Sequence, residues 1–438
     1  MTRAWLSCLL STVQFLPYNQ EDNLQYVKNM VASQPQTVVA AGWVEKVQAQ
    51  QSGVTHITIR QNNQKKVWRV QDDENGWAKL PLQSVVRLHS DIPGEDPLCR
   101  LELVHRAQPL PISIDQYDAQ DLTQRHLGIR SDFFRATAEF RHLVRKYAFE
   151  FLDNQNCMFV QTPILTNASC VCSGDVFTFP YYGKQIATLT QSPWMYADAL
   201  VSGVERVYAL NPSFRRETDP TSIHLVEIWQ LQVDMAWTSN DDIIKMEQDL
   251  IHHIASKLQQ HPELYAKADL GMSHLEQLLK PFKRLSYGDS VRLLNELGYP
   301  FEYGSDYTAE HNNVIGAHFQ VPYFITDFPM SLKNFWFAHD TENADLSPSN
   351  DLFSHMGQGE IIGGGTRVSD YEELKANLEL FGHDLDEFAW FVDIRRYGCV
   401  PHSGFSIGFD RLVATLMGVQ DIRQATLFPR MPQGQLKP

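Results

Sequence analysis

The 438-residue sequence contains few cysteines and no long apolar run. Its six cysteines include no CxxC pair, and no histidine stands at zinc-finger spacing, so we expect reduced thiols and no structural zinc. Cys170 and Cys172 are one residue apart, which leaves a redox or metal pair as an alternative. The apolar residues 4–10 are too few for a membrane span or a signal peptide. These features indicate a cytoplasmic protein with no attachment to a membrane.

Positive charge is also scarce. The sequence has 37 Lys and Arg against 52 Asp and Glu, which gives a formal net charge of -15. Proteins that bind nucleic acid through overall charge have the opposite balance, because phosphates require clustered Lys and Arg. The deficit excludes binding of that kind but not a local basic surface. A hydrophobic content of 43% and a charged content of 20% are typical of a globular protein with a sizeable core.

The sequence that is present divides into four parts. Residues 1–35 form an N-terminal extension to which the sequence assigns no role. Residues 36–110 contain five short runs of alternating apolar and polar residues, a pattern typical of a small antiparallel barrel. A five-stranded OB-like β-barrel fits, and another small β domain is the alternative. Residues 111–130 have the composition of a linker, and the mix of long helices and antiparallel strands in residues 131–438 predicts an α+β domain.

The C-terminal part opens with a strong helix signal. Apolar residues recur at helical spacing from Phe140 onward, and Asp132 is the expected N-cap. The helix should end near Asn154 and be followed by a buried strand, CMFVQTP, that Pro163 closes. A second long helix is expected over residues 240–260.

The first motif with candidate chemistry is FRRETDPTSIHLVEIWQLQVDMAW. It places Arg215 and Glu217 two residues apart at the end of a strand, so their side chains should share one face. A planar guanidinium suits a phosphate or a carboxylate, and the neighbouring acid can accept a hydrogen bond from an exocyclic amine. Considered alone, a surface hairpin with an ion pair is the simpler interpretation.

The second motif, GFSIGFDRLVATLMG, is a glycine-containing strand that leads directly into an amphipathic helix. Gly404 and Gly408 allow a flat ring to lie against the backbone, and Arg411 in the first helical turn can hold a base or a terminal phosphate. The two motifs in this order are far more specific than either one alone.

With the preceding helix and the VQTP strand, these motifs resemble the three motifs of the class II aminoacyl-tRNA synthetases. VSGVERVYALNPSFRRE, TSIHLVEIWQ, GEIIGG, FVDIRRYGCVPHSGF and IRQATLFPR narrow the resemblance to subclass IIb and its asparaginyl branch. Ala197 agrees, since a lysine there would mark the aspartyl branch. The resemblance extends from about Thr37 to Arg430. It implies an OB-type anticodon-binding barrel, a six-stranded antiparallel catalytic sheet flanked by helices, and a homodimer with the first helix and Pro163 at its interface.

The resemblance assigns residues to an ATP site. It implies that Arg215 and Arg411 are the catalytic residues, with Arg215 on the α-phosphate and substrate carboxylate and Arg411 on the γ-phosphate and base. It places Glu217 at the adenine edge, and Glu360 with Asp351 on a Mg2+ ion that contacts the ATP phosphates.

The same resemblance places His224, Ile228 and Gly408 in ATP-binding segments, although two family features are missing there. Ile223 replaces the arginine of the family's RHL sequence, and Ile228 replaces the aromatic residue expected over adenine. For the acid substrate, the resemblance implies that Arg367 recognises the polar side chain of aspartate or asparagine.

The largest departures from the family concern the α-ammonium group of the substrate. Val171 and Gln232 occupy positions where the family has acidic residues, and Trp194 occupies that of a glutamine. A buried ammonium without its carboxylate partners loses about 3–5 kcal/mol. Two alternatives stay open: a shifted register around Val171, or compensation by another acid. In the barrel, His56 lies near the position of the family's base-stacking aromatic residue, and the loop before it lacks the family's arginines, which argues against tRNA recognition.

The leading hypothesis from these residues is an ATP- and Mg2+-dependent ligase that forms an acyl-adenylate from a carboxylic acid without an ordinary α-ammonium. It would transfer the acyl group to an amine or another small acceptor. The alternative is a divergent but genuine asparaginyl-tRNA synthetase. An asparagine synthetase-like enzyme and a non-catalytic module are further alternatives, and retention of Arg215, Arg411 and Glu360 argues against the last.

Overall fold

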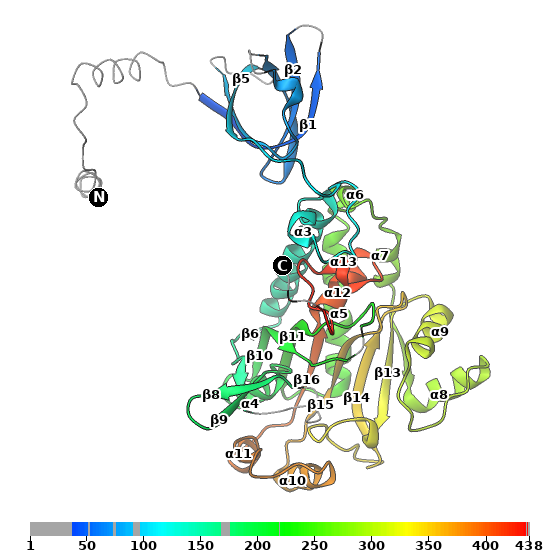
Figure 1. Ribbon diagram of the computed structural model, residues 1–438. Coiled ribbons are helices and arrows are strands. Elements are labelled where there is room, and N and C mark those ends of the chain that lie inside the picture. The colour runs from blue at the N-terminus through cyan, green and yellow to red at the C-terminus, as the bar shows by residue number, and fades with distance from the viewer. Residues whose placement is uncertain are drawn as a thin grey trace. The chain divides into compact units, whose positions relative to one another are not determined.

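The computed structural model describes residues 37–50, 53–72, 76–90, 97–167, 176–218, 220–434 and 436. Contacts divide the chain into two compact units, with the boundary after Pro111. Figure 1 labels the elements of both units, which are described separately below. Val171, Cys170 and Cys172 lie outside the described residues, while Cys157 and Cys399 are free thiols.

The N-terminal unit contains the five strands that the alternating runs predict: β1 (Thr37–Ala49), β2 (Val54–Gln61), β3 (Gln64–Gln71), β4 (Val85–Ser90) and β5 (Leu98–His105). They pair in the order β1-β2-β3-β5-β4, and β4 also pairs with β1, so each strand has two neighbours. The β3–β5 pair is parallel, and the prediction of purely antiparallel pairing is wrong there. Alternate residues such as Ile57, Ile59 and Trp68 point inward and form the core.

The C-terminal unit is built on an eight-stranded sheet of order β12-β13-β14-β15-β16-β11-β10-β6. These strands are β6 (Met158–Phe159), β10 (Arg206–Phe214), β11 (Glu227–Ala236), β12 (Lys283–Ser286), β13 (Tyr323–Pro329), β14 (Leu346–Phe353), β15 (Glu360–Thr366) and β16 (His402–Gly408). The six from β13 to β10 are antiparallel, but a parallel strand is added at each edge, so the expected six-stranded sheet is wrong in number. Strands of two and four residues are too short to show periodicity in a sequence.

A separate small sheet has the order β7-β9-β8 and is made of β7 (Leu165–Thr166), β8 (Thr178–Tyr181) and β9 (Gln185–Leu189). The expected buried strand before Pro163 is wrong in length and environment. Only Met158 and Phe159 form a strand, and their side chains are 57% and 42% exposed.

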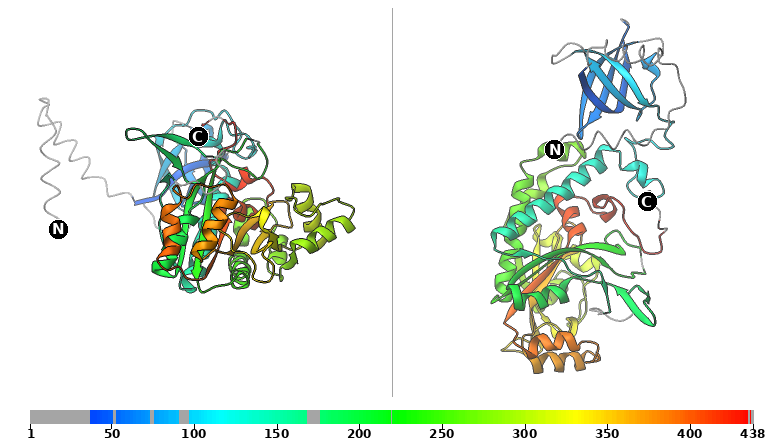
Figure 2. Two further views of the ribbon diagram at one scale, coloured as in Figure 1. Left: turned by 90° about the horizontal axis from the view of Figure 1, so that it is seen from below. Right: turned by 90° about the vertical axis from the view of Figure 1, so that its left-hand side faces the viewer.

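Two long helices cover one face of the main sheet, as Figure 2 shows. They are α3 (Asp132–Asn154) and α5 (Asn240–Leu258), and with α12 (Phe409–Met417) they share one core with Leu231, Val233 and Met235 of β11. The predicted N-cap of α3 is one residue off. Ser131 is the cap, because its hydroxyl accepts a hydrogen bond from the Phe134 amide at 3.2 Å.

The remaining helices are short: α2 (Arg125–Gly128), α4 (Trp194–Val204), α6 (Pro262–Lys267), α7 (Ser273–Leu278), α8 (Tyr287–Glu296), α9 (Ala309–Phe319), α10 (Tyr371–Leu380), α11 (Ala389–Arg396) and α13 (Ile422–Ala425), with 3-10 turns at Trp77–Lys79 and Met330–Leu332. Among the described residues, no helix is both long enough and apolar enough to cross a membrane.

A buried ionic cluster joins α4, α11 and β16. Asp198 accepts hydrogen bonds from two nitrogens of Arg395, at 2.7 and 2.9 Å, and lies 3.0 Å from the Nε2 atom of His402. Burial alone would raise the pKa of Asp198, but the Arg395 and His402 cations outweigh it and hold that pKa below its usual range. Burial would likewise lower the pKa of His402, yet the Asp198 carboxylate raises it to about 10. All three groups are therefore charged near neutral pH.

We predict that Asp198→Asn lowers the free energy of unfolding by about 3–5 kcal/mol, because it leaves two buried cations without their carboxylate. A raised histidine pKa contributes stability fully below about pH 6.5, and that stability is lost as the pH rises through 10. The difference between parent and variant should therefore shrink at alkaline pH. Urea unfolding from pH 6 to 10 measures it. Asp393→Asn, at an exposed pair with Arg396, is the control and should change little.

Candidate active site

A cavity of about 590 Å³ lies over the face of the main sheet opposite α3 and α5. Strand β11 shows how the sheet forms it. Successive side chains of a strand alternate between faces, so Leu231 and Val233 enter the helix-covered core while Gln230 and Gln232 line the cavity. One strand thus provides part of the core on one face and polar site residues on the other.

Eleven of the twelve sequence-predicted site residues line this one cavity: Trp194, Arg215, Glu217, His224, Ile228, Gln232, Asp351, Glu360, Arg367, Gly408 and Arg411. The twelfth, Val171, is not among the described residues. The residues come from strands, helices and loops that are far apart in the sequence. The fold therefore brings the sequence motifs to a single place.

Arg411 lies in the first turn of α12, as its motif predicts. Its Nε and Nη1 atoms donate to the main-chain carbonyls of Ile223, at 3.2 Å, and Glu360, at 2.7 Å. Burial lowers the pKa of this guanidinium, although it remains far above neutrality. Since carbonyls carry no net charge, these bonds orient Arg411 and leave its positive charge available to an anion.

Arg215 follows the end of β10, where its main-chain amide donates to the Val226 carbonyl at 3.0 Å. Its Nε atom is buried and has no hydrogen-bond partner among the residues that the structure describes. Nearby, His224 contacts the Thr221 hydroxyl through Nδ1 at 2.6 Å, and burial together with Arg411 lowers the pKa of the imidazole. His224 is therefore neutral at pH 7, so the two arginines are the cations on this side of the cavity.

Two carboxylates approach each other at Gly363 on β15. A Cβ atom on Gly363 would lie 2.8 Å from Oε1 of Glu360 and 3.3 Å from Oδ1 of Asp351, so glycine leaves room for both. Lys333 donates to both oxygens of Asp351, at 2.9 and 2.8 Å. Burial raises the pKa of Asp351 to about 7, with Lys333 opposing that rise.

This donor set fits a Mg2+ ion that a phosphate substrate helps to bind. In the described part of the chain, no group of three or more His, Cys, Asp or Glu could hold a metal. Magnesium commonly takes one or two protein carboxylates and completes its shell with water and phosphate oxygens. Glu360 is the more available ligand, because Asp351 is already paired with Lys333.

Trp194 lies between the cavity and an apolar core. Its indole is 5% exposed and packs on Trp336, with ring centroids 4.3 Å apart, and on Phe335 and Phe391. The rings belong to one core cluster, so a substrate has little of the Trp194 face to stack on. Its buried Nε1 atom has no partner in the described part of the chain, which leaves a hydrogen-bond donor at the cavity wall.

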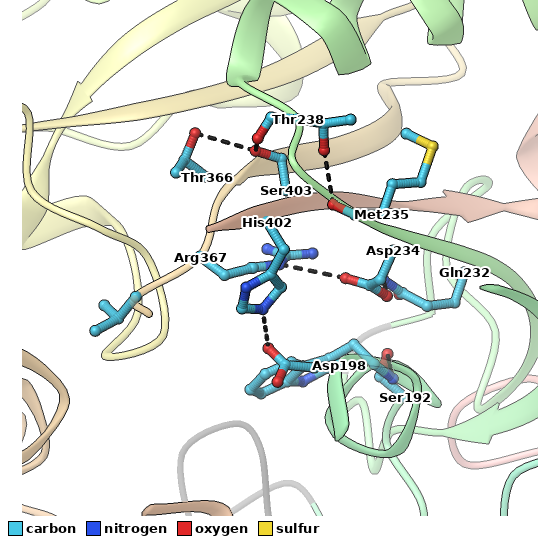
Figure 3. Close-up of polar contacts among 12 residues, drawn as sticks. Ser192, Asp198, Gln232, Asp234, Met235, Thr238, Thr366, Arg367, His402 and Ser403 are labelled. Carbon is cyan, nitrogen blue, oxygen red and sulfur yellow. Dashed lines mark hydrogen bonds and ion pairs between the residues drawn. The ribbon is translucent and has the colours of Figure 1, made fainter. Parts of the chain in front are cut away.

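The sequence interpretation missed Asp234. Period-two alternation places it on the same face of β11 as Gln232, and it is fully buried. Figure 3 shows its carboxylate between Gln232 and Arg367. Oδ2 accepts a hydrogen bond from Nε2 of Gln232 at 2.6 Å, and Oδ1 lies 3.5 Å from Nε of Arg367. The space exists because residue 404 is glycine: a Cβ there would lie 2.0 Å from Oδ1.

The cavity wall therefore presents unsatisfied polar atoms of both kinds. Within the described residues, buried donors without partners include Nε of Arg215 and Nε1 of Trp194, and buried acceptors without partners include the side-chain oxygens of Gln230 and Gln232. Buried polar groups without a partner are costly, so a ligand that supplies both an acceptor and a donor would be stabilised here. A molecule with a carboxylate and an ammonium has that combination.

Comparisons with known proteins agree on one family. The family described as "tRNA synthetases class II (D, K and N)" matches residues 118–432. The chain is 36% identical to an asparagine–tRNA ligase of Pelotomaculum thermopropionicum over 360 residues, 81% of this chain and 83% of that protein. It is 30% identical to that of Thermococcus kodakarensis over 415 residues, 90% of this chain and 95% of the other.

A solved structure resembles the chain over nearly the same length. Asparaginyl-tRNA synthetase from Pyrococcus horikoshii, complexed with asparaginyl-adenylate, superimposes with a TM-score of 0.85 at 30% identity. The superposition covers 91% of this chain and 95% of that one.

We predict that Asp234→Asn changes how stability depends on pH. Burial raises the pKa of Asp234 to about 7, and Arg367 opposes that rise. A raised carboxyl pKa contributes stability fully below about pH 4, and that stability is lost as the pH rises through 7. The free energy of unfolding of the parent relative to the variant should therefore fall by a few kcal/mol, roughly, between pH 4.5 and 8. Urea unfolding at both pH values measures the fall, and a constant difference would contradict the buried ionisation.

Proposed function

The chain belongs to the class II tRNA synthetases (D, K and N), and on that premise we propose that it activates asparagine with ATP and transfers it to tRNA. This is the alternative of the two main hypotheses from the sequence. The two relatives described above, which match this chain over 83% and 95% of their own length, are asparagine–tRNA ligases. They offer no support for a ligase that uses another acid and a small acceptor.

The observation that carries the proposal is the set of unpaired polar atoms in the cavity. Nε of Arg215 suits the carboxylate of an amino acid, and the carbonyl oxygens of Gln230 and Gln232 suit its ammonium. The sequence argument against an α-amino acid assumed that only a carboxylate could receive the ammonium. Two unsatisfied amide oxygens in the same cavity remove that assumption.

Activation in this site needs charge and positioning rather than a base, because the substrate carboxylate is already ionised. One of its oxygens forms a bond to the α-phosphorus of ATP while the bond to the pyrophosphate oxygen breaks, which yields acyl-adenylate and pyrophosphate. Arg215 holds the carboxylate and α-phosphate, and Arg411 holds the leaving pyrophosphate. Arg367 donates to the side-chain carbonyl of asparagine. Glu217, His224, Ile228 and Gly408 would enclose the adenine.

Magnesium, when bound by Glu360 and Asp351, would supply positive charge to the phosphate oxygens. In the second half-reaction a ribose hydroxyl of tRNA attacks the acyl carbon, AMP leaves with the oxygen that joined it to the acid, and the hydroxyl proton passes to the leaving phosphate. Both half-reactions balance without a further reactant.

The outer face of the barrel supports tRNA as the acceptor, if the barrel is the OB-type domain that the family resemblance implies. Residues paired across β1, β2 and β3 form rows on that face: Trp43 with Arg60 and Lys65, Lys46 with Thr58 and Val67, and Gln48 with His56 and Arg69. The Arg60 guanidinium lies 4.4 Å from the centre of the Trp43 ring, although Glu45 pairs with Arg60 and Lys65. A basic face with aromatic rings suits unpaired nucleotides. A local basic surface is thus compatible with the acidic chain as a whole.

The proposal includes a homodimer. The family resemblance implies a dimer interface built on the first motif. Large apolar side chains that a monomer would expose lie in that region, on the short strands after α3. They are Met158, Phe159, Leu165 and Ile186, each 42% exposed or more. Apolar side chains gathered at a surface commonly mark a protein interface.

We predict that Arg215→Ala and Arg411→Ala each reduce asparagine-dependent ATP–pyrophosphate exchange by at least about a hundredfold, because each removes a cation from the phosphates. Sedimentation should be unchanged, since neither side chain belongs to a core cluster. Arg292→Ala is the matched control, because Arg292 pairs with Asp289 on the exposed surface of α8. Normal exchange in either site variant would refute the mechanism. Asparagine charging of tRNA by the parent tests the second half of the proposal.

We predict that Glu360→Gln raises the Mg2+ concentration for half-maximal exchange by about tenfold or more, because an amide is a weaker ligand than a carboxylate. Titration of Mg2+ at saturating ATP measures it. Glu379→Gln on α10 is an exposed control and should titrate as the parent does. An unchanged titration for Glu360→Gln would reject this residue as a ligand.

A further inference from the structure

We infer that Gln232 receives the α-ammonium of the substrate through its side-chain carbonyl, and that Asp234 is the positioning residue that turns the amide that way. The inference rests on the proposed function, since it concerns how an amino acid is held in the same cavity. In this arrangement the neutral side chain of Gln232, held in place by the buried carboxylate of Asp234, selects an α-amino acid.

The orientation of the Gln232 amide follows from its partner. An ionised carboxylate can only accept hydrogen bonds, so the 2.6 Å contact with Asp234 requires the NH2 group of Gln232 to face Asp234. The carbonyl oxygen at the other corner of the same amide must then point away. That oxygen is buried, has no partner among the described residues, and belongs to a residue that lines the cavity. The Gln232 amide therefore presents a hydrogen-bond acceptor to the cavity, and its donor group faces Asp234.

Asp234 acts through Gln232 and not by direct contact. It is fully buried and is not among the residues that line the cavity, whereas Gln232 is. Figure 3 shows Arg367 on the other side of the Asp234 carboxylate. A carboxylate that accepts from the amide NH2 polarises the amide and makes its carbonyl oxygen a stronger acceptor. The negative charge therefore favours a cation in the cavity while remaining outside it.

The neighbouring groups agree with an ammonium at Gln232. Ser406 stands opposite Gln232 across the β11–β16 pair. Its buried hydroxyl oxygen has no partner in the part of the chain that the structure describes, so it is a second acceptor on that wall. The Trp194 Nε1–H can only donate, which suits an oxygen of the substrate and excludes an ammonium. The two ends of an amino acid are thus distinguished by which wall accepts and which donates.

The state of Asp234 decides which corner of the amide faces the cavity. A protonated Asp234 can donate to the Gln232 oxygen, which allows the amide to turn its NH2 toward the cavity and oppose an ammonium. The charged groups around Asp234 are Arg367 at the end of β15, Asp198 on α4, His402 on β16 and Arg395 on α11. Burial raises the pKa of Asp234 to about 7 and Arg367 lowers it, so asparagine should bind more weakly as the pH falls below 7. An acid without an ammonium should show no such loss.

The test compares two ligands that differ only in the ammonium: asparagine and its deaminated analogue, succinamic acid. Full-length parent, Asp234→Asn, Gln232→Met and the double variant are compared at pH 8 by calorimetric binding and by the KM for pyrophosphate exchange. A hydrogen bond to a charged group is typically worth a factor of about ten or more, so each single variant should weaken asparagine by that factor. Succinamic acid should change less than about twofold.

The double variant separates positioning from a structural role. If Asp234 acts only through Gln232, the double variant should lose no more asparagine affinity than the worse single variant. Thermal unfolding checks that each variant is folded, and the exposed Asp393→Asn serves as the charge-removal control. Parent and Asp234→Asn are also compared with both ligands from pH 6 to 8. The loss of asparagine affinity at low pH should occur in the parent and be absent in the variant.

Each other outcome has a distinct meaning. If the parent prefers asparagine but the folded variants keep that preference, the inference is wrong and the proposed function stands. If the parent prefers succinamic acid, or binds neither ligand at millimolar concentration, both are rejected. Additive losses in the double variant would show that Asp234 does not work through Gln232.

Discussion

The burial of carboxylates beside the cavity is the constraint on which the C-terminal unit depends. An ionised carboxylate away from water must be matched by cations and hydrogen bonds, or it takes up a proton. Asp198 is matched by Arg395 and His402, and Asp234 by Arg367 and the amide of Gln232. The first set of contacts joins α4, α11 and β16, and the second joins β11 to the end of β15. The geometry of the substrate wall and the stability of this region therefore have a common origin.

Because side chains alternate between the two faces of the central sheet, one strand can supply both core residues and site residues. Strand β11 gives Leu231 and Val233 to the core under α3 and α5, and Gln230 and Gln232 to the cavity. The neighbouring strands complete the wall through absent side chains. Gly363 leaves room for two carboxylates, and a Cβ at residue 404 would collide with Asp234. Glycine at these positions of β15 and β16 is as necessary to the site as the charged residues themselves.

Local patterns predicted local features well. The five barrel strands, the two long helices and the position of Arg411 in its first turn all follow from spacing in the sequence. Features that depend on distant neighbours could not be predicted. The packing of Trp194 on Trp336, the pairing of Asp351 with Lys333 and the acceptor orientation of Gln232 each require knowledge of which residue lies across a fold interior. Two short edge strands, β6 and β12, carried no periodic signal at all.

The proposed substrate of this chain is an amino acid, even though familiar ammonium ligands are missing from its sequence. The most direct test is the ratio of kcat/KM values for ATP–pyrophosphate exchange with asparagine and with succinamic acid, measured on the parent protein at pH 8. We expect asparagine to be preferred by about tenfold or more, since one charge-assisted hydrogen bond separates the two ligands. Equal values, or a preference for succinamic acid, would contradict it.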